Sequence, residues 1–405
     1  MNVPKIEQLD KLIKQHIGKN KTIVDTKITR LTAPGENYGS EMLKVDLIVK
    51  SNDTGSTEDL NVVAKLIPSS EFFRVVFNIQ VSFKNEKAFY DTIVPTLQDF
   101  QKKHGIEAVI DFFPSFFGSR NNLKYDDGQV DDDAALVLEN LKIKGYTNID
   151  RQVGFDIPST KLILKYLAQL HAVTLALKQE DPKLFESKVK PYLAHFSPNI
   201  PNEASEKIIS FIEESEKCRH LAPKLRKSFD TSDEDESREI LNKRFYTLVH
   251  KDLWVNNIML KLNNGSPIDC KFVDFQGYSY ASPATDVLFF LFTSVELEAL
   301  QNNLDDLLKF YLEQFNSTLK SLNSHLSLTY DGLINEICGS TQRELSHVVF
   351  MTLVVILTPP MGGPPPSIDG MNGPPDLSKL VFKESAVEKI LWVLEEWDKR
   401  GWMKF

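Results

Sequence analysis

Cysteine is scarce in this sequence: Cys218, Cys270 and Cys338 are the only three among 405 residues. None of them shares the C-x-x-C spacing of a zinc site, and three isolated thiols cannot build a disulfide framework. Such a pattern is typical of reduced thiols, so we expect a cytoplasmic protein.

Long apolar segments and basic runs are also missing. The longest apolar run, Val348 to Leu357, is far shorter than the ~20 residues that cross a bilayer, and Met1 to Lys5 begins no signal-peptide core. A nucleic-acid binder needs a concentrated basic face, but the formal net charge is −9 and no basic run exceeds a pair such as Lys102-Lys103. We therefore expect no membrane and no nucleic-acid partner, and no obligate protein partner is evident.

What is present fits a folded protein with two lobes. Hydrophobic residues make up 42% of the chain and charged residues 25%, as in an ordinary globular protein of more than one domain. Alternating patterns such as Leu43 to Val49 predict strands in the first part of the chain. From Ser159 onward, helical patterns dominate.

The most informative stretch runs from His250 to Asn257 and is followed by Asp274. A histidine, an acid two residues later and an amide five residues after that acid form the H-x-D-x-x-x-x-N spacing of a phosphoryl-transfer loop. Two short apolar runs flank Asn263-Asn264-Gly265, which predicts a hairpin with a tight turn. That hairpin would bring Asn257 and Asp274 together.

Phosphoryl transfer explains these residue types. A hard cation with oxygen ligands neutralises a triphosphate, so we predict that Asn257 and Asp274 bind Mg²⁺ beside ATP. Asp252 is predicted to accept the proton of the acceptor hydroxyl or to orient it, and His250 to brace the loop. A single loop aspartate more often caps a turn or a helix, but the whole spacing in this context favours catalysis.

A lysine inside an apolar strand predicts the opposite wall of the nucleotide site. Lys65 lies within Leu60 to Ile67, where an ammonium group needs either solvent or an anionic partner. Glu86 follows on a mostly helical stripe, and a strand lysine paired with a helix glutamate is the phosphate clamp of a kinase small lobe. Gly35 and Gly39, between two strands, could let backbone N–H groups approach phosphates, although most such loops are plain turns.

Three further predictions concern the strand before the hinge, Asp286 and His171. The apolar strand Ala134 to Leu141 ends where a two-lobed kinase has its hinge, so Glu139 and Leu141 are predicted to offer main-chain groups to adenine. Asp286 begins an apolar helix, and we expect it either to complement the helix dipole or to bond the catalytic-loop backbone. His171 lies on the packing face of a long helix and is expected to be a core histidine.

Four segments together resemble the ecdysteroid kinase-like family, also called CHK kinase-like, which is found largely in insects and is similar to choline and aminoglycoside kinases. They are Gly35 to Ser40, Leu138 to Leu141, His250 to Met259 and Val273 to Gln276. The likeness covers nearly the whole chain.

The resemblance implies an α+β, bilobal, protein-kinase-like fold with an N-terminal antiparallel sheet lobe and a mainly helical C-terminal lobe. Residues 1–141 would bind the nucleotide and end in the hinge, and residues 142–405 would hold the catalytic and substrate-binding groups. The resemblance also implies ATP-dependent phosphorylation of a small-molecule alcohol, with ecdysteroid hormones as the named substrate of the family.

By motif position, the resemblance makes Asp252 the catalytic base, Asn257 and Asp274 the Mg²⁺ ligands, and Lys65 with Glu86 the phosphate clamp. All of these residues are present, whereas a non-catalytic nucleotide-binding relative would be expected to lack some of them.

Two positions depart from related kinases. Lys251 stands where they usually have glycine, and this adds a cation that could touch phosphate or face solvent. Gln276 replaces the glycine of a protein-kinase D-F-G, as is usual in the resembled family, which argues against activation-loop switching. No A-P-E segment follows Asp274, and this disfavours a protein substrate.

The acceptor alcohol is the least defined part of the prediction. Phenylalanine-rich C-terminal helices would suit an ecdysteroid or a similar apolar alcohol, although aromatic residues at helical spacing are more often core than pocket. The alternatives are a choline/ethanolamine-type kinase, for which no aromatic cage can be located, a xenobiotic-detoxifying kinase, or a non-catalytic relative.

Overall fold

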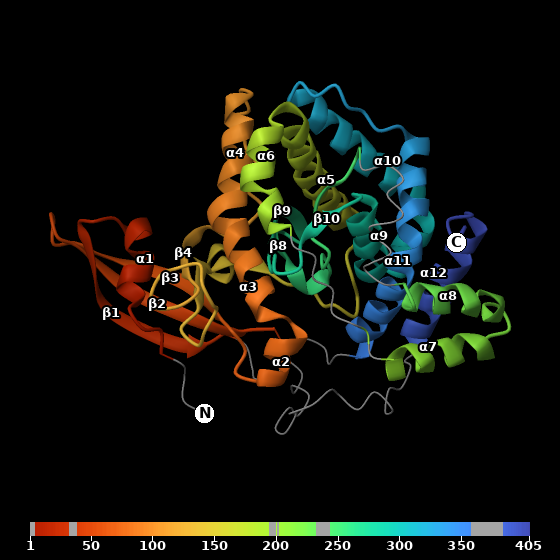
Figure 1. Ribbon diagram of the computed structural model, residues 1–405, viewed down its shortest axis with the longest axis horizontal. Coiled ribbons are helices and arrows are strands. Elements are labelled where there is room, and N and C mark those ends of the chain that lie inside the picture. Colours follow the sequence, from red (N-terminus) through yellow and green to blue (C-terminus); the bar gives the residue numbers. More distant parts are fainter. Residues whose placement is uncertain (1–4, 32–38, 194–199, 201, 232–243, 358–383) are drawn as a thin grey trace.

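The computed structural model describes residues 5–31, 39–193, 200, 202–231, 244–357 and 384–405. A β-rich N-terminal lobe lies at one end and a mainly helical lobe at the other (Figure 1). This is the bilobal α+β arrangement, with an antiparallel sheet lobe and a mainly helical lobe, that is expected from the sequence. The boundary between residues 141 and 142 stays a prediction.

The N-terminal lobe contains a five-stranded antiparallel sheet in the order β1-β2-β3-β5-β4. Leu43 to Val49 alternate as predicted, and their buried side chains pack against the amphipathic helix α1 (Leu9–Ile17). The strands are β1 (Lys21–Arg30), β2 (Glu41–Ser51), β3 (Thr57–Leu66), β4 (Phe116–Arg120) and β5 (Ala135–Glu139).

Strand β3 lies at the centre of this sheet and determines where Lys65 points. Lys65 pairs with Met42 on one side and with Leu136 on the other. Its neighbour Ala64 packs on the α1 side, and successive side chains of a strand point to opposite faces. Lys65 therefore faces away from α1, toward the helices that follow β3 in sequence.

Those helices are less regular than the sequence predicts. The stripe from residue 72 to 90 breaks at Asn78, whose φ of 41° is left-handed and separates α2 from α3. A π-helical turn at Phe89 then leads into α4, and the Phe89 ring stacks on Phe275 at 3.6 Å. The elements are α2 (Glu71–Val76), α3 (Ile79–Ala88), the π-turn Phe89–Ile93 and α4 (Val94–Lys103).

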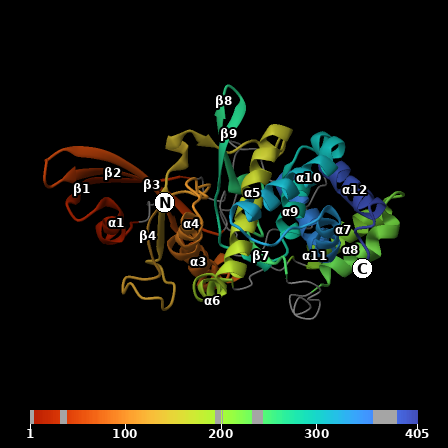
Figure 2. The ribbon, with the colours of Figure 1, turned by 90° about the horizontal axis from the view of Figure 1, so that it is seen from above.

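Small sheets carry the segments that contain the predicted catalytic residues. Strand β7 (Thr247–Val249) pairs with β10 (Ser279–Ala281), and β6 (Tyr146–Thr147) pairs with the hairpin β8 (Ile258–Asn263) and β9 (Ser266–Phe272). Asn264 and Gly265 have φ values of 49° and 81°, so the predicted hairpin with its tight turn is confirmed. The hairpin projects from the body where the two lobes meet (Figure 2).

Helices build the rest of the C-terminal lobe around α9, whose residues are all buried. Long α5 is capped by Asp156, whose carboxylate accepts from the Ser159 N–H at 2.9 Å. Among the helices of the described residues, none is long and apolar enough to cross a membrane. The helices are α5 (Ile157–Glu180), α6 (Pro182–Lys188), α7 (Asn202–Glu214), α8 (Ala222–Phe229), α9 (Ala284–Ser294), α10 (Leu297–Ser321), α11 (Tyr330–Leu357) and α12 (Glu384–Lys399).

Gly118 permits the close approach of α1 to β4. A Cβ atom at this position would overlap the backbone carbonyl of Leu12, and the φ of 157° already disfavours other residues. We expect Gly118→Ala to lower the free energy of unfolding by about 1–3 kcal/mol, the usual cost of overpacking. Urea denaturation measures this change.

The matched control is Gly339→Ala in α11, where no atom lies within 4 Å of an added Cβ. Alanine favours the helix by about 0.5–1 kcal/mol relative to glycine. Equal urea midpoints for the two alanine variants would contradict this account of α1 packing.

Candidate active site

His250 ties the loop that follows β7 to the segment that carries Asp274. The imidazole is fully buried, and its Nε2 donates to the Val273 carbonyl at 3.1 Å. Its Nδ1 accepts from the Asp252 N–H at 3.3 Å. Burial lowers the pKa of His250, so the ring is neutral and bonds at both nitrogens.

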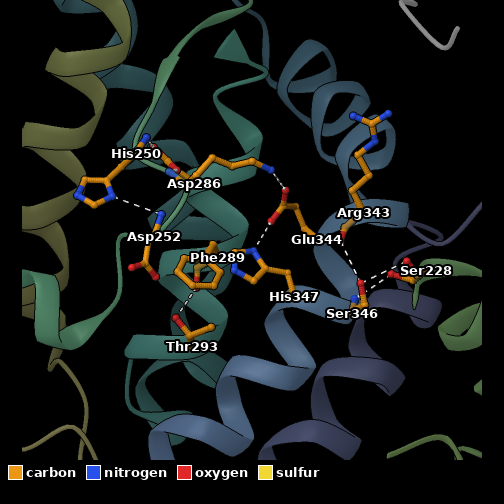
Figure 3. Close-up of polar contacts among 11 residues, drawn as sticks. Ser228, His250, Asp252, Asp286, Phe289, Thr293, Arg343, Glu344, Ser346 and His347 are labelled. Carbon is orange, nitrogen blue, oxygen red and sulfur yellow. Dashed lines mark hydrogen bonds and ion pairs between the residues drawn. The ribbon is translucent and has the colours of Figure 1, made fainter. Parts of the chain in front are cut away.

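Asp286, at the start of α9, binds the backbone of the same loop. Its two carboxylate oxygens accept from the backbone N–H groups of His250 at 2.6 Å and Lys251 at 2.8 Å (Figure 3). Of the two predicted roles for Asp286, the structure shows bonding to the loop backbone. His171, a buried core histidine as predicted, bonds the same carboxylate at 3.1 Å and the Tyr311 hydroxyl at 2.8 Å.

Asp286 is charged in this setting. Burial by itself would raise its pKa, but the hydrogen bond and charge of His171 and the N–H donors of the loop backbone lower the pKa below its ordinary value. A buried, ionised carboxylate thus fixes the backbone directly before Asp252.

Asp252 and Asn257 face each other across the loop. The Asn257 side-chain amide donates to the Asp252 carbonyl at 2.8 Å and to its carboxylate at 2.9 Å. These bonds use the nitrogen of the amide and leave its oxygen as the atom able to bind a cation. Burial and, next, the charge of Asp274 raise the pKa of Asp252 to about 8.

Asp274 returns to this loop through the hairpin. The Val273 N–H donates to the Asn257 carbonyl at 3.0 Å, so the chain segments of the two predicted Mg²⁺ ligands are adjacent. Asp274 has a φ of 67°, a left-handed conformation that is costly for a residue other than glycine and is common at functional sites.

Lys65 joins this cluster from the N-terminal lobe. Its ammonium group donates to Glu86 at 2.6 Å and to Asp274 at 2.7 Å, and only 7% of its side chain is exposed. Burial would lower the pKa of Lys65, but the charges of Asp274 and Glu86 raise it above its ordinary value, so the group is a cation. The sequence predicts the Glu86 partner and misses the contact with Asp274.

The predicted adenine and phosphate contacts lie at the edges of this cluster. Glu139 ends β5, and its N–H already donates to the Ser115 carbonyl at 2.9 Å. Leu141 begins a short 3₁₀ turn (Leu141–Lys144). Gly39 approaches Gln276 so closely that an added Cβ would lie 3.2 Å from its amide, whereas Gly35 lies outside the described residues.

A small apolar cluster completes the site and is not predicted from the sequence. Leu141, Tyr146 and Met259 are buried together, and Val273 packs against them. The group includes the predicted hinge residue Leu141, and an apolar surface suits the face of a purine base. A signal was present, because Met259 and Val273 lie within two positions of the predicted Mg²⁺ ligands Asn257 and Asp274.

The donor set fits Mg²⁺. It consists of one carboxylate and one amide oxygen, and Mg²⁺ binds one or two carboxylates while phosphates and waters fill its other positions. Among the residues that the structure covers, no group of three or more His, Cys, Asp or Glu side chains could hold a metal ion. The nucleotide phosphates would therefore supply the remaining ligands.

Lys251 forms an ion pair with a helix of the C-terminal lobe. Its ammonium group pairs with Glu344 of α11 at 3.2 Å, and 19% of the Lys251 side chain is exposed. The largely buried side chain does not fit the solvent alternative, and contact with phosphate stays a prediction. The sequence does not show that a helix 93 positions later lies beside the loop.

Comparison with known proteins identifies a family. The sequence model of the ecdysteroid kinase-like family matches residues 34–324, which confirms the resemblance. No curated protein matches this chain.

Several solved structures are similar over most of this chain. Choline kinase from Cryptosporidium parvum Iowa II is 11% identical with a TM-score of 0.44, and the match covers 93% of this chain and 91% of the kinase. A GDP complex of aminoglycoside 2′-phosphotransferase is 11% identical with a TM-score of 0.41, over 98% and 100%. A complex of spectinomycin phosphotransferase with ADP and spectinomycin is 12% identical with a TM-score of 0.38, over 92% and 94%.

The contacts of Asp286 predict a large loss of stability for Asp286→Asn. One buried loop N–H would face an NH₂ group in place of a carboxylate oxygen, so we expect the free energy of unfolding to fall by about 3 kcal/mol in urea denaturation. Asp306→Asn, on the exposed face of α10, is the control and should change it little. Equal losses in the two variants would contradict the role of Asp286.

The same carboxylate predicts a pH dependence. Because His171 and the loop N–H groups depress the folded pKa of Asp286, its stabilising contribution is full above its unfolded pKa of about 3.9 and is lost as pH falls through the folded pKa. The difference in unfolding free energy between the wild type and Asp286→Asn should therefore shrink below about pH 4. Urea titrations at a series of pH values measure it, and a constant difference would show that the charge is immaterial.

Proposed function

We propose that this chain, which belongs to the ecdysteroid kinase-like family, is an ATP-dependent kinase that phosphorylates a hydroxyl group of a small molecule. The observation that carries the proposal is the contact of the Lys65 ammonium with both Glu86 and Asp274, at 2.6 and 2.7 Å. A cation from one lobe and a carboxylate from the other, with Asn257 beside it, are the parts that phosphoryl transfer recurrently uses.

In this proposal the N-terminal lobe holds the nucleotide. Lys65 binds the phosphates while Glu86 fixes its position, and Gly35 and Gly39 belong to the loop over the phosphates. Main-chain groups at Glu139 and Leu141 bond the edge of the adenine, whose face rests on the apolar cluster defined above.

The C-terminal lobe holds the metal and the acceptor. Asn257 and Asp274 would bind Mg²⁺, which when bound neutralises charge on the phosphates. The acceptor oxygen bonds to the γ-phosphorus, ADP leaves, and the hydroxyl proton passes to the Asp252 carboxylate, while His250 keeps the loop in place. The negative charge of Asp274 is a cause of the high pKa of Asp252. A cation bound at Asp274 would offset this charge, lower the pKa of Asp252 and favour its ionised form, which is the form able to accept a proton.

For the acceptor we propose an ecdysteroid or a similar apolar alcohol. The family description supports this choice. The phenylalanines of α9 do not, because Phe289, Phe290 and Phe292 are fully buried core residues. The alternative kinase functions are a choline/ethanolamine-type kinase and a xenobiotic-detoxifying kinase. The second candidate function is that of a non-catalytic nucleotide-binding relative.

A panel assay separates these functions. The protein is incubated with labelled ATP, magnesium and a set of ecdysteroids, choline, ethanolamine, xenobiotic phenols and glycosides, and the phosphorylated products are separated. We expect transfer to an ecdysteroid. Transfer to choline alone would overturn the apolar acceptor, and nucleotide binding without any transfer would favour the non-catalytic relative.

Asp252→Asn tests the catalytic base. We expect the rate of transfer to fall by about 10²–10⁴, because the amide cannot accept the hydroxyl proton. Nucleotide affinity, measured by calorimetry, should be retained. Asp306→Asn is the control with unchanged turnover, and an Asp252→Asn enzyme of wild-type rate would refute the assignment.

Asp274→Asn tests the metal site. Calorimetry with magnesium and with EDTA should show that the Mg²⁺-dependent part of ATP affinity falls at least about tenfold, the smallest loss that even outer-shell changes cause at metal sites. Glu86→Gln also disturbs Lys65 but removes no metal ligand. It should weaken ATP binding equally with and without magnesium, and the same pattern in Asp274→Asn would argue against a metal role.

A further inference from the structure

Lys251 has a backbone conformation that its residue type disfavours. Its φ of 69° lies in the left-handed region, where glycine is the default residue. The Lys251 N–H donates to Asp286 at 2.8 Å, which holds the backbone in this conformation. The next residue in the chain is Asp252.

The side chain of Lys251 reaches a second helix. Its ammonium group lies 3.2 Å from one carboxylate oxygen of Glu344, whose side chain is only 2% exposed. The other oxygen of Glu344 bonds the imidazole of His347 at 3.2 Å, and this ring stacks on Phe289 at 4.2 Å (Figure 3). Burial would raise the pKa of Glu344, but the charge of Lys251 lowers it to about 2.

Stability alone does not account for this arrangement. A buried ion pair is weak evidence for stabilisation, because desolvation offsets the attraction between the charges. A left-handed lysine adds a backbone cost that a glycine would avoid. Two costly features at the residue directly before Asp252 indicate a role in the reaction.

We infer that Lys251 and Glu344 are positioning residues whose ion pair locks the catalytic loop to α11 and thereby fixes where the Asp252 carboxylate meets the acceptor. The inference rests on the proposed kinase function for its catalytic readout. The main chain of Lys251 is held by α9 through Asp286, and its side chain is held by α11 through Glu344. With both held, the loop cannot rotate about either contact alone.

A double-mutant cycle tests the pair. Lys251→Gly removes the side chain and keeps a residue that accepts the observed φ, so the fold should be retained. We expect kcat to fall about 10–100-fold, as small misplacements of catalytic groups cause. The KM for ATP should change less than about twofold, because nucleotide binding does not use this pair. Glu344→Gln should lower kcat in the wild-type background and add nothing in the Lys251→Gly background.

Two variants serve as controls with unchanged kcat. Asn323→Gly makes the same backbone exchange at an exposed left-handed residue with a φ of 57°. Lys224→Ala removes an ion pair between two other helices, that with Asp398 at 2.9 Å between α8 and α12, whose side chains are 32% and 37% exposed. A wild-type kcat in Lys251→Gly would overturn the inference. It would also be overturned if the losses of kcat in the two single variants multiplied in the double variant, because Lys251 would then act independently of Glu344, on the phosphates.

Hydrogen exchange measured by mass spectrometry keeps the inference distinguishable from the kinase proposal. In Lys251→Gly, exchange should rise in the peptide that spans residues 250–257, while the exchange of α5 stays near wild type. If the wild type transfers no phosphoryl group, the kinase proposal fails and exchange alone decides on the lock. Unchanged exchange in residues 250–257 would overturn it.

Discussion

The site where the two lobes meet contains more carboxyl groups than protein cations, and the rest of the structure is arranged around it. Lys65 brings one buried ammonium group to Glu86 and Asp274, and Asp252 lies close enough to Asp274 for its pKa to rise. Three carboxyl groups thus share one protein cation. Such a cluster retains excess negative charge, which a bound cation relieves, and this is the electrostatic reason why the site suits a metal-bound nucleotide.

The C-terminal lobe holds the loop from His250 to Asn257 through three contacts. Asp286 bonds its backbone, His250 bonds the segment before Asp274, and Lys251 pairs with Glu344. Each restraint uses a buried polar group, which is costly unless it is satisfied. All three contacts act on one loop, so these buried polar groups of the C-terminal lobe serve to fix the position of that loop.

Local patterns made part of the site predictable. The spacing from His250 to Asn257, the hairpin turn and the pairing of Lys65 with Glu86 depend on chain segments whose geometry follows from strand and helix periods. The contacts with Asp274 and Glu344 join residues 209 and 93 positions apart, and no period encodes which distant faces meet. The phenylalanines of α9 show the same limit, because periodicity identifies an apolar face but does not separate core from pocket.

The ring stack behind Asp274 has a consequence for inhibitor chemistry. Phe275 is fully buried, lies parallel to Phe89 at 3.6 Å and meets Phe113 edge-on at 5.4 Å. Gln276 follows it in contact distance of Gly39. An outward swing of this phenylalanine would leave a large apolar void and expose its ring, at a cost of about 3–5 kcal/mol for emptying a buried phenylalanine site. A ligand that requires this ring to leave its place would have to offset that cost, so ligands that leave Phe275 packed are favoured at this site.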